Sequence, residues 1–287
     1  MKKLLVLGCM VLGFSTMQAQ KAWNEWNGNN IFEHVGVGVG VGLTGVTIDV
    51  GTDITDYLTL RGGVDIFPKV SMDFDVKTGF EAKFDKSKVP ARYSLPKDKV
   101  KIQGETALGA GHLLLDIHPF KTAFRITTGL YFGNDKIITV QNKDNNDFIG
   151  IANWNKDISS TPMPADLALL ATANGGTLPR VGIEMGDYFL APDNTGHVDA
   201  CIKVNSVRPY VGLGFGRMVP KKSRLTCNFD MGVQFWGTPG VYLNGIDGEK
   251  KLEKSDLDNG DGSEALDILS KVTVYPVITL RLVGRIF

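Results

Sequence analysis

The sequence predicts an all-β fold: an antiparallel, up-and-down transmembrane β-barrel of eight strands, with ten strands as the alternative. Three observations support it. The N-terminus has the pattern of a secretory signal peptide, no later segment is apolar enough for a spanning helix, and long stretches alternate apolar and polar residues. Only helices and closed barrels satisfy every backbone hydrogen-bonding group in lipid. If the mature chain lies in a membrane, it must therefore be a barrel.

The first twenty residues carry the export signal. Two lysines precede an apolar run from Leu4 to Phe14, and the small residues after it predict cleavage behind Ala19. The run is too short to span a bilayer, which takes about 20 apolar residues. Cys9 follows a weak lipoprotein pattern, but cleavage there would leave almost no apolar region. We therefore expect a signal peptide over residues 1–19 and a single outer-membrane β-barrel domain over residues 20–287.

Charge and cysteine content exclude other classes. The 31 basic and 31 acidic residues balance, so no basic surface calls for nucleic acid, and no nucleic-acid partner is expected. Only Cys201 and Cys227 remain after cleavage. A hairpin over residues 207–235 would hold them roughly 40 Å apart at about 3.3 Å per residue, and a disulfide spans at most about 7 Å. We therefore predict two free thiols.

Period-two alternation marks eight strands. The clearest covers residues 57–66, and its phase continues past Pro68 to Val76, which predicts one long strand bent at the proline. The other predicted strands cover residues 35–43, 46–50, 113–117, 124–132, 207–215, 225–235 and 278–286. The ten-strand alternative adds a hairpin formed by residues 180–190 and 197–205.

The first hairpin begins with a strict valine-glycine alternation. Its apolar phase moves from odd to even positions past Thr44 and Gly45, which requires a turn or a bulge. We favour the turn because it makes the strand number even, and the bulge stays as the alternative.

The connections differ in length from one end of the predicted barrel to the other. Residues 52–56, 118–122 and 218–223 are short, whereas residues 77–100, 142–197 and 244–270 are long and polar. Outer-membrane barrels have short turns in the periplasm and long loops outside. This pattern predicts the outer membrane of a Gram-negative bacterium, with outer-membrane lipids around the barrel.

Several stretches together resemble the small outer-membrane β-barrel proteins, a broad group akin to the OmpA- and OmpW-like barrels. They are VGVGVG, DYLTLRGGV, LLLDIHPF, AFRITTGLYFGN, RPYVGLGFGR, FDMGVQFWGTPGVYL and the C-terminal YPVITLRLVGRIF. The resemblance implies the barrel-insertion machinery as a partner and the terminal Phe287 as the insertion signal. The sequence departs from the group at Arg285, where an aromatic residue is usual.

The inward face of the predicted barrel is charged. We expect mixed-sign pairs across hairpins, Asp116 with Arg125 and Asp49 with Arg61, in a structural ion-pair network. Inward glycines on two strands leave space that either large residues such as Tyr131, Tyr210 and Trp236 fill, which we favour, or that stays a narrow aqueous path. The predicted lumen-facing polar network comprises Asp49, Arg61, Asp65, His112, Asp116, Arg125, Asp230, Gln234, Arg281 and Arg285.

These features predict a structural barrel or a narrow passive channel for a small solute. The alternative is a surface-interaction protein, adhesin-like or ligand-binding, that acts through its long loops. No catalytic residues are expected, because none of the four histidines lies in a recognisable nucleophile arrangement. No cofactor or metal is expected either, since the acidic stretch over residues 256–264 fails the EF-hand template for calcium. We expect this stretch to be a solvated loop tip, and weak calcium binding between loops stays the alternative.

Overall fold

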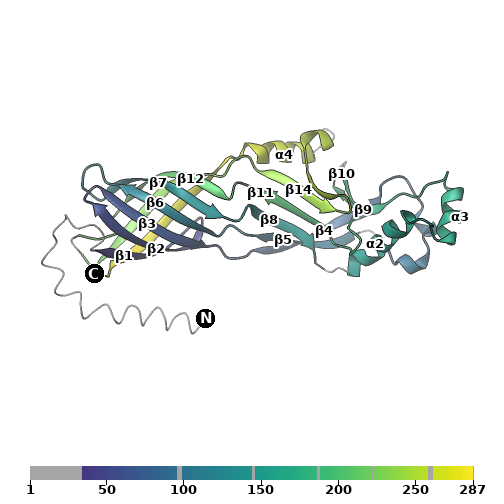
Figure 1. The fold of residues 1–287 in the computed structure, drawn as a ribbon, viewed down its shortest axis with the longest axis horizontal. Helices are drawn as coiled ribbons and strands as arrows, with labels where there is room; N and C mark the ends of the chain where they lie inside the picture. Colours follow the sequence, from purple (N-terminus) through teal and green to yellow (C-terminus); the bar gives the residue numbers. More distant parts are fainter. Residues whose placement is uncertain are drawn as a thin grey trace, which may run out of the picture.

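The computed structural model describes residues 34–95, 99–143, 146–185, 188–221, 223–257 and 261–286. Within this part of the chain, eight antiparallel strands close into a barrel in the order β1-β16-β13-β12-β7-β6-β3-β2 (Figure 1). They are β1 (Val35–Gly42), β2 (Gly45–Thr55), β3 (Leu58–Ile66), β6 (Ala110–Ile117), β7 (Phe124–Gly133), β12 (Val207–Phe215), β13 (Leu225–Phe235) and β16 (Val274–Arg285). The predicted eight-stranded all-β barrel is confirmed. The signal peptide and Phe287 lie outside the described residues.

The first hairpin turns tightly. Gly42 lies opposite Gly45 in the register of β1 and β2, and Gly45 has a φ of 97°, a left-handed conformation that favours glycine. The predicted turn is therefore confirmed and the alternative bulge is wrong. The barrel closes where β1 pairs with β16, from Gly36 opposite Arg285 to Gly42 opposite Thr279.

A second sheet stands on one end of the barrel (Figure 1). Five adjacent barrel strands, β3, β6, β7, β12 and β13, continue through short connectors into five of its strands in the same neighbour order. Its full order is β10-β9-β4-β5-β8-β11-β14-β15. The strands are β4 (Ser71–Phe80), β5 (Lys99–Thr106), β8 (Lys136–Asn142), β9 (Val181–Met185), β10 (Tyr188–Leu190), β11 (Asp199–Lys203), β14 (Gly240–Gly245) and β15 (Gly248–Lys251).

Two strand predictions need correction. Residues 57–76 form two strands, because β3 ends at Ile66 and β4 begins at Ser71 beyond Pro68, in the second sheet. The ten-strand barrel is wrong, since β9, β10 and β11 also belong to the second sheet. Alternation shows that a segment is a strand with two different faces, but it does not show which sheet the strand joins.

The predicted long loops are largely folded. They contain the helices α2 (Asn146–Ile158), α3 (Ala165–Ala173) and α4 (Asp261–Lys271) and the short 3-10 turns η1 (Lys86–Lys88), η2 (Ala91–Tyr93) and η3 (Lys254–Asp256). No helix among the described residues has the length and apolar character needed to cross a membrane.

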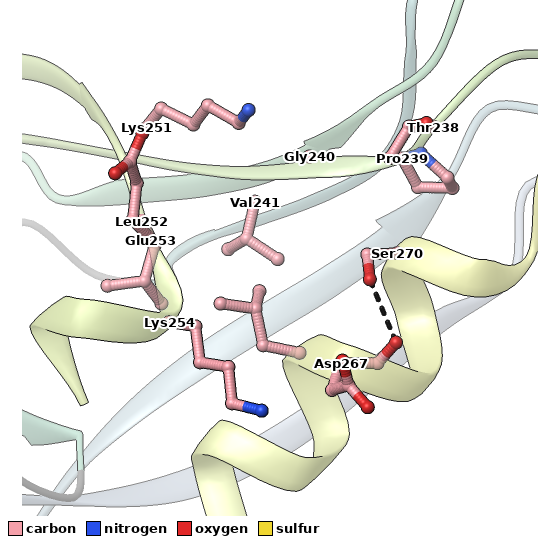
Figure 2. Close-up of a pocket in the computed structure, with 11 residues that line it drawn as sticks. Thr238, Pro239, Gly240, Val241, Lys251, Leu252, Glu253, Lys254, Asp267 and Ser270 are labelled. Carbon is pink, nitrogen blue, oxygen red and sulfur yellow. Dashed lines mark hydrogen bonds between the residues drawn. The ribbon is translucent and has the colours of Figure 1, made fainter. Parts of the chain in front are cut away.

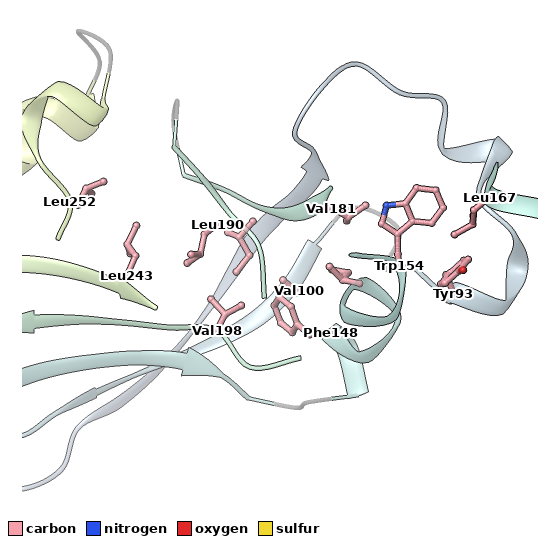
Figure 3. Close-up of a cluster of buried hydrophobic side chains, with 12 residues drawn as sticks. Tyr93, Val100, Phe148, Trp154, Leu167, Val181, Leu190, Val198, Leu243 and Leu252 are labelled. Carbon is pink, nitrogen blue, oxygen red and sulfur yellow. The ribbon is translucent and has the colours of Figure 1, made fainter. Parts of the chain in front are cut away.

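A hydrophobic core fills the far end of the second sheet (Figure 3). Phe148, Ile151 and Trp154 recur every third residue on α2 and are fully buried, because this spacing keeps them on one helix face. They pack with Tyr93 and Leu167 and with apolar residues of the sheet. The expectation of a long polar loop over residues 142–197 was wrong here, because it gave the polar composition more weight than this helical spacing of apolar residues.

The two cysteines are both free thiols, which confirms the absence of a disulfide. Cys201 is buried in β11 of the second sheet, and Cys227 is exposed on β13 of the barrel. The hairpin prediction placed Cys227 beside residues 213–215, and this register is wrong, since Phe229 lies opposite Phe215. Burial raises the pKa of the Cys201 thiol.

Candidate functional site inside the barrel

Alternation along each barrel strand separates an apolar outer face from a polar inner one. On β13, for example, Phe229 and Met231 are exposed, while Asn228 and Asp230 between them are buried. Large exposed apolar side chains also cover the outer face elsewhere, among them Val41, Ile48, Val64, Leu113, Leu130, Leu213, Leu280 and Leu282. An apolar band of this extent is rare on proteins surrounded by water and is the lipid-facing pattern of membrane barrels.

Asp230 lies at the centre of the charged interior. Its carboxylate accepts hydrogen bonds from Arg125 Nη2 at 2.6 Å, from Arg281 Nη1 at 2.5 Å and from Arg61 Nη1 at 3.3 Å. The three arginines come from β7, β16 and β3, so the cluster joins strands from all sides of the barrel. All four side chains are at most 4% exposed.

Asp116 forms the second acidic position of the cluster. It lies 3.1 Å from Arg61 Nη2 and 3.6 Å from Arg125 Nε, and it accepts a hydrogen bond from Thr127 Oγ1 at 2.7 Å. The structure therefore brings Asp116 and Arg125 together, as their predicted places on one hairpin suggested. Thr127 lies directly opposite Asp116 in the register of β6 and β7.

Asp49 has a different partner from the predicted one. Its carboxylate lies 2.5 Å from Arg281 Nε and 2.6 Å from His112 Nε2. The predicted Asp49–Arg61 pair is wrong, because Asp49 lies opposite Gly63 in the register and Arg61 reaches toward Asp116 and Asp230 instead. Arg281 is available to Asp49 only because the barrel closes.

Asp65 lies on the other side of His112 from Asp49, closer to the second sheet. Its carboxylate is 3.7 Å from His112 Nδ1, and neither oxygen accepts a hydrogen bond from any residue that the structure describes. His112 also contacts Tyr131, with ring centroids 4.9 Å apart. Asp65 and His112 are 4% and 5% exposed, so both are closed off from solvent.

Large side chains occupy the space above the inward glycines. A Cβ atom on Gly38 would lie 2.6 Å from the side chain of Arg281, and one on Gly214 would lie 2.6 Å from Asp230 Oδ1. Tyr131 and Tyr210 form a buried layer with ring centroids 5.3 Å apart. The glycines thus make room for arginines, and the tyrosines fill the adjacent layer.

Two further layers close the ends of the barrel. At the end with the short turns, Met218 and Val219 of the β12–β13 connection are 1% and 0% exposed, and Met218 lies against Gly36, Gly38 and Gly51. At the other end, Trp236 is buried in a cluster with Ile137 and Val204. The sequence prediction missed Met218 and Val219, although two apolar residues in a short turn were a usable signal.

The remaining residues of the predicted polar network, Gln234 and Arg285, lie outside the charged cluster. Gln234 is buried opposite Tyr210 and Tyr275, above the charged cluster. Arg285 is only partly buried, at the last residue of β16 near the end with the short turns. Arg208 was not predicted, although it shares the inward phase of Tyr210; its guanidinium donates to the carbonyl oxygens of Asn205 and Asn134.

The cluster pairs charges of opposite sign. Arg61, Arg125 and Arg281 face Asp49, Asp116 and Asp230, so three arginines meet three carboxylates that are buried from solvent, and His112 with Asp65 adjoins them. Paired and hydrogen-bonded charges can be retained inside a protein, whereas isolated ones are strongly destabilising. No group of three potential metal-ligating side chains occurs among the described residues. This arrangement can hold strands together and exclude water.

A second candidate site lies outside the barrel, where a cavity of about 230 Å³ opens between α4, β14 and β15 (Figure 2). Val241, Leu252 and Leu266 give it an apolar lining, and two basic and two acidic side chains share its rim. Because these charges balance, the cavity does not indicate a class of ligand. The acidic stretch considered for calcium lies partly outside the described residues.

This chain resembles several solved structures, among them the following three. Acinetobacter baumannii CarO2 is 15% identical with a TM-score of 0.41, over 90% of this chain and 100% of that one. Acinetobacter baumannii CarO is 14% identical with a TM-score of 0.40, over 89% and 99% of the two chains. A major outer membrane protein from Thermus thermophilus is 12% identical with a TM-score of 0.31, over 88% and 98%.

No family model and no curated protein matches the sequence. The fold is therefore assigned from the barrel's own strand arrangement and surface. A closed ring of antiparallel strands, apolar outside and charged inside, is the fold of the small outer-membrane β-barrels.

Proposed function

We propose that this chain is an integral outer-membrane protein whose barrel is closed by its own side chains and carries the second sheet on the outer surface of the cell. The exposed apolar band supports insertion into lipid. The short turns at one end, with the folded sheet at the other, support an orientation with the turns in the periplasm. Outer-membrane lipids and the barrel-insertion machinery are the partners of this proposal, and it includes no enzymatic activity.

A structural role is favoured over a passive channel. The observation that carries this choice is the ion-paired cluster around Asp230, in which Asp230 and the three arginines that contact it are at most 4% exposed. An eight-stranded barrel has an interior just wide enough for side chains. Three further layers of side chains block the interior at other levels along the barrel axis. They are formed by Met218, by Tyr131 and Tyr210, and by Trp236.

Reconstitution in planar lipid bilayers tests this role. We expect the folded protein, identified by a shift in gel mobility between boiled and unboiled samples, to produce no stable conductance steps. Steps that disappear when Gly214 is replaced by a bulky residue would instead support the narrow channel. Recovery of the protein in full yield as a soluble periplasmic form would overturn the membrane location as well.

A surface-interaction role is the second candidate, and one observation favours it. The second sheet has its own hydrophobic core, in which Phe148, Trp154 and Leu167 are completely buried. A segment that served only to join barrel strands would need no such core. We therefore propose that this sheet presents a defined surface outside the bilayer.

Cysteine labelling on intact cells tests the orientation. In a Cys227→Ser background, we expect a membrane-impermeant maleimide to label Leu169→Cys on α3, where Leu169 is 75% exposed. It should not label Lys121→Cys, which is exposed at the opposite end of the barrel. Permeabilised cells provide the control, since both variants should then react. Labelling of Lys121→Cys alone on intact cells would reverse the proposed orientation.

A further inference from the structure

We propose that a cavity at the short-turn end of the barrel binds the phosphate group of an anionic glycerophospholipid, whose acyl chains lie along the adjacent outer face. This inference rests on the proposed insertion of the barrel into lipid and adds a defined lipid site to it. The cavity, which we call the turn cavity, has a volume of about 470 Å³. Its side chains that can donate hydrogen bonds are Lys121, Thr122, Arg217, Lys221, Ser223 and Thr226.

Two connections between barrel strands form the walls of the turn cavity. Residues 118–123 join β6 to β7, and the connection that begins at Gly216 joins β12 to β13. Gly216 N donates to the carbonyl oxygen of Ala123 at 2.9 Å, which ties the two walls together. His118 is completely buried, and its Nδ1 lies 3.2 Å from the carbonyl oxygens of Thr122 and Phe124. The walls are therefore held in place by the barrel.

The lining of the turn cavity is positively charged. Its charged side chains among the described residues are Lys121, Arg217 and Lys221, all of them basic. Asp56 lies outside the lining, where its carboxylate bonds Lys221 and lies 3.5 Å from Lys121 Nζ. Asp53 attracts Arg217 electrostatically. Three cations beside these two carboxylates leave an excess of positive charge, which favours an anionic lipid over a zwitterionic one.

The bonds to Asp56 do not exhaust the lysines. An ammonium group has three N–H donors, so Lys121 and Lys221 can each bind an oxygen of Asp56 and a second anion together. Asp56 thereby keeps both ammonium groups beside the turn cavity.

Arg217 supplies the most firmly held cation. It is only 8% exposed, and its Nη2 donates to the carbonyl oxygen of Asp56 at 3.1 Å. Its Nη1 has no hydrogen-bond acceptor among the residues that the structure describes. Buried polar groups are nearly always hydrogen-bonded, and a guanidinium group matches a phosphate in geometry as well as in charge. A phosphate group in the turn cavity would supply the missing acceptor.

The outer face beside the turn cavity is aromatic. Phe120 and Phe124 flank the cavity residues 121–123 in the sequence, and Phe215 precedes Gly216. The Phe124 ring centroid lies 6.4 Å from that of Phe120 and 5.5 Å from that of Phe215. Phe120 and Phe215 are 71% and 57% exposed. Aromatic residues mark the level where headgroups meet acyl chains. A phospholipid matches both the basic cavity and these rings, whereas free phosphate matches the cavity alone.

Native mass spectrometry of the purified, delipidated protein in detergent tests the proposal. We expect each protein to retain one dioleoylphosphatidylglycerol molecule, bound more tightly than dioleoylphosphatidylcholine. Lys121→Gln combined with Lys221→Gln should weaken the binding of phosphatidylglycerol by about tenfold, because two basic groups at the phosphate are lost. The shift in gel mobility shows that this variant still folds.

A matched variant separates the turn cavity from net charge. Lys99→Gln combined with Lys101→Gln removes the same charge from exposed positions on β5 of the second sheet, and it should bind phosphatidylglycerol like the native protein. Equal binding by the native protein and the Lys121 and Lys221 double variant would overturn the proposal. So would equal binding of the two lipids.

Competition with inorganic phosphate separates a lipid site from a small-anion site. An excess of phosphate should displace no more lipid than chloride does at the same ionic strength, since phosphate cannot contact the aromatic rings. Displacement by phosphate alone would assign the turn cavity to a small anion and refute the lipid. Insertion into vesicles is measured on the same samples, so a protein that inserts without retaining phosphatidylglycerol contradicts this inference and leaves the proposed function intact.

Discussion

Replacing Asp230 with alanine should destabilise the barrel by about 3–5 kcal/mol, the range expected when one member of a buried ion-pair cluster is removed. Three guanidinium groups approach this carboxylate, and the variant would leave them with Asp49 and Asp116 alone. The excess positive charge would lie where solvent cannot reach it. Urea unfolding in lipid vesicles, followed by tryptophan fluorescence, measures the change.

Met231→Ala is the matched control for this prediction. Met231 is the next residue on β13 and is half exposed on the outer face, so its truncation should cost no more than about 1 kcal/mol. The double variant Asp230→Ala with Arg125→Ala should lose less stability than the sum of its single variants, because it removes a charge of each sign. Strict additivity would show that the cluster is not coupled as the distances imply.

Gly36→Ala should almost abolish the folded barrel, although it adds a single methyl group. The new Cβ would lie 1.7 Å from the backbone carbonyl oxygen of Met218, in the connection that enters the barrel. A backbone atom cannot move aside as a flexible side-chain end can, so either this connection or β1 must be displaced. The fraction of protein that shows the gel-mobility shift after refolding into vesicles measures the loss.

Gly62→Ala tests whether any added methyl group is harmful. Its Cβ would meet the carbonyl oxygen of His112 at 3.6 Å and the Leu113 side chain at 3.8 Å, which are ordinary contacts. We expect this variant to refold like the native chain. If Gly36→Ala refolded equally well, Met218 would not occupy the position inside the barrel that the structure gives it.

The barrel strands could be predicted because a strand with one face toward lipid and the other toward a charged interior alternates apolar and polar residues along the sequence. The hairpin of β6 and β7 shows this, since Leu113 and Ile126 face outward while Asp116 and Arg125 face inward. The local pair Asp116–Arg125 followed from the same pattern.

Contacts across the barrel could not be predicted in this way. Arg281 meets Asp49 because β16 pairs with β1, and residues from opposite ends of the sequence carry no local signal of each other. The second sheet was missed for a related reason. Its strands β4 and β11 alternate like barrel strands, and only their neighbours distinguish them. Helix α2, which contains Trp154, did show a helical spacing of apolar residues in the sequence, but the polar residues between them obscured it.

The tight turn between Gly42 and Gly45 also sets the outline of the whole molecule. The β1–β2 hairpin and β16 end at the level where the five other barrel strands continue. The second sheet therefore extends the barrel on one side only. Lengthening this one hairpin by about seven residues per arm, at about 3.3 Å per residue, would extend β2 alongside residues 71–77 of β4, which pair on one side only, with β5. The length of a single hairpin thus decides whether the barrel and the second sheet are continuous on this side of the molecule.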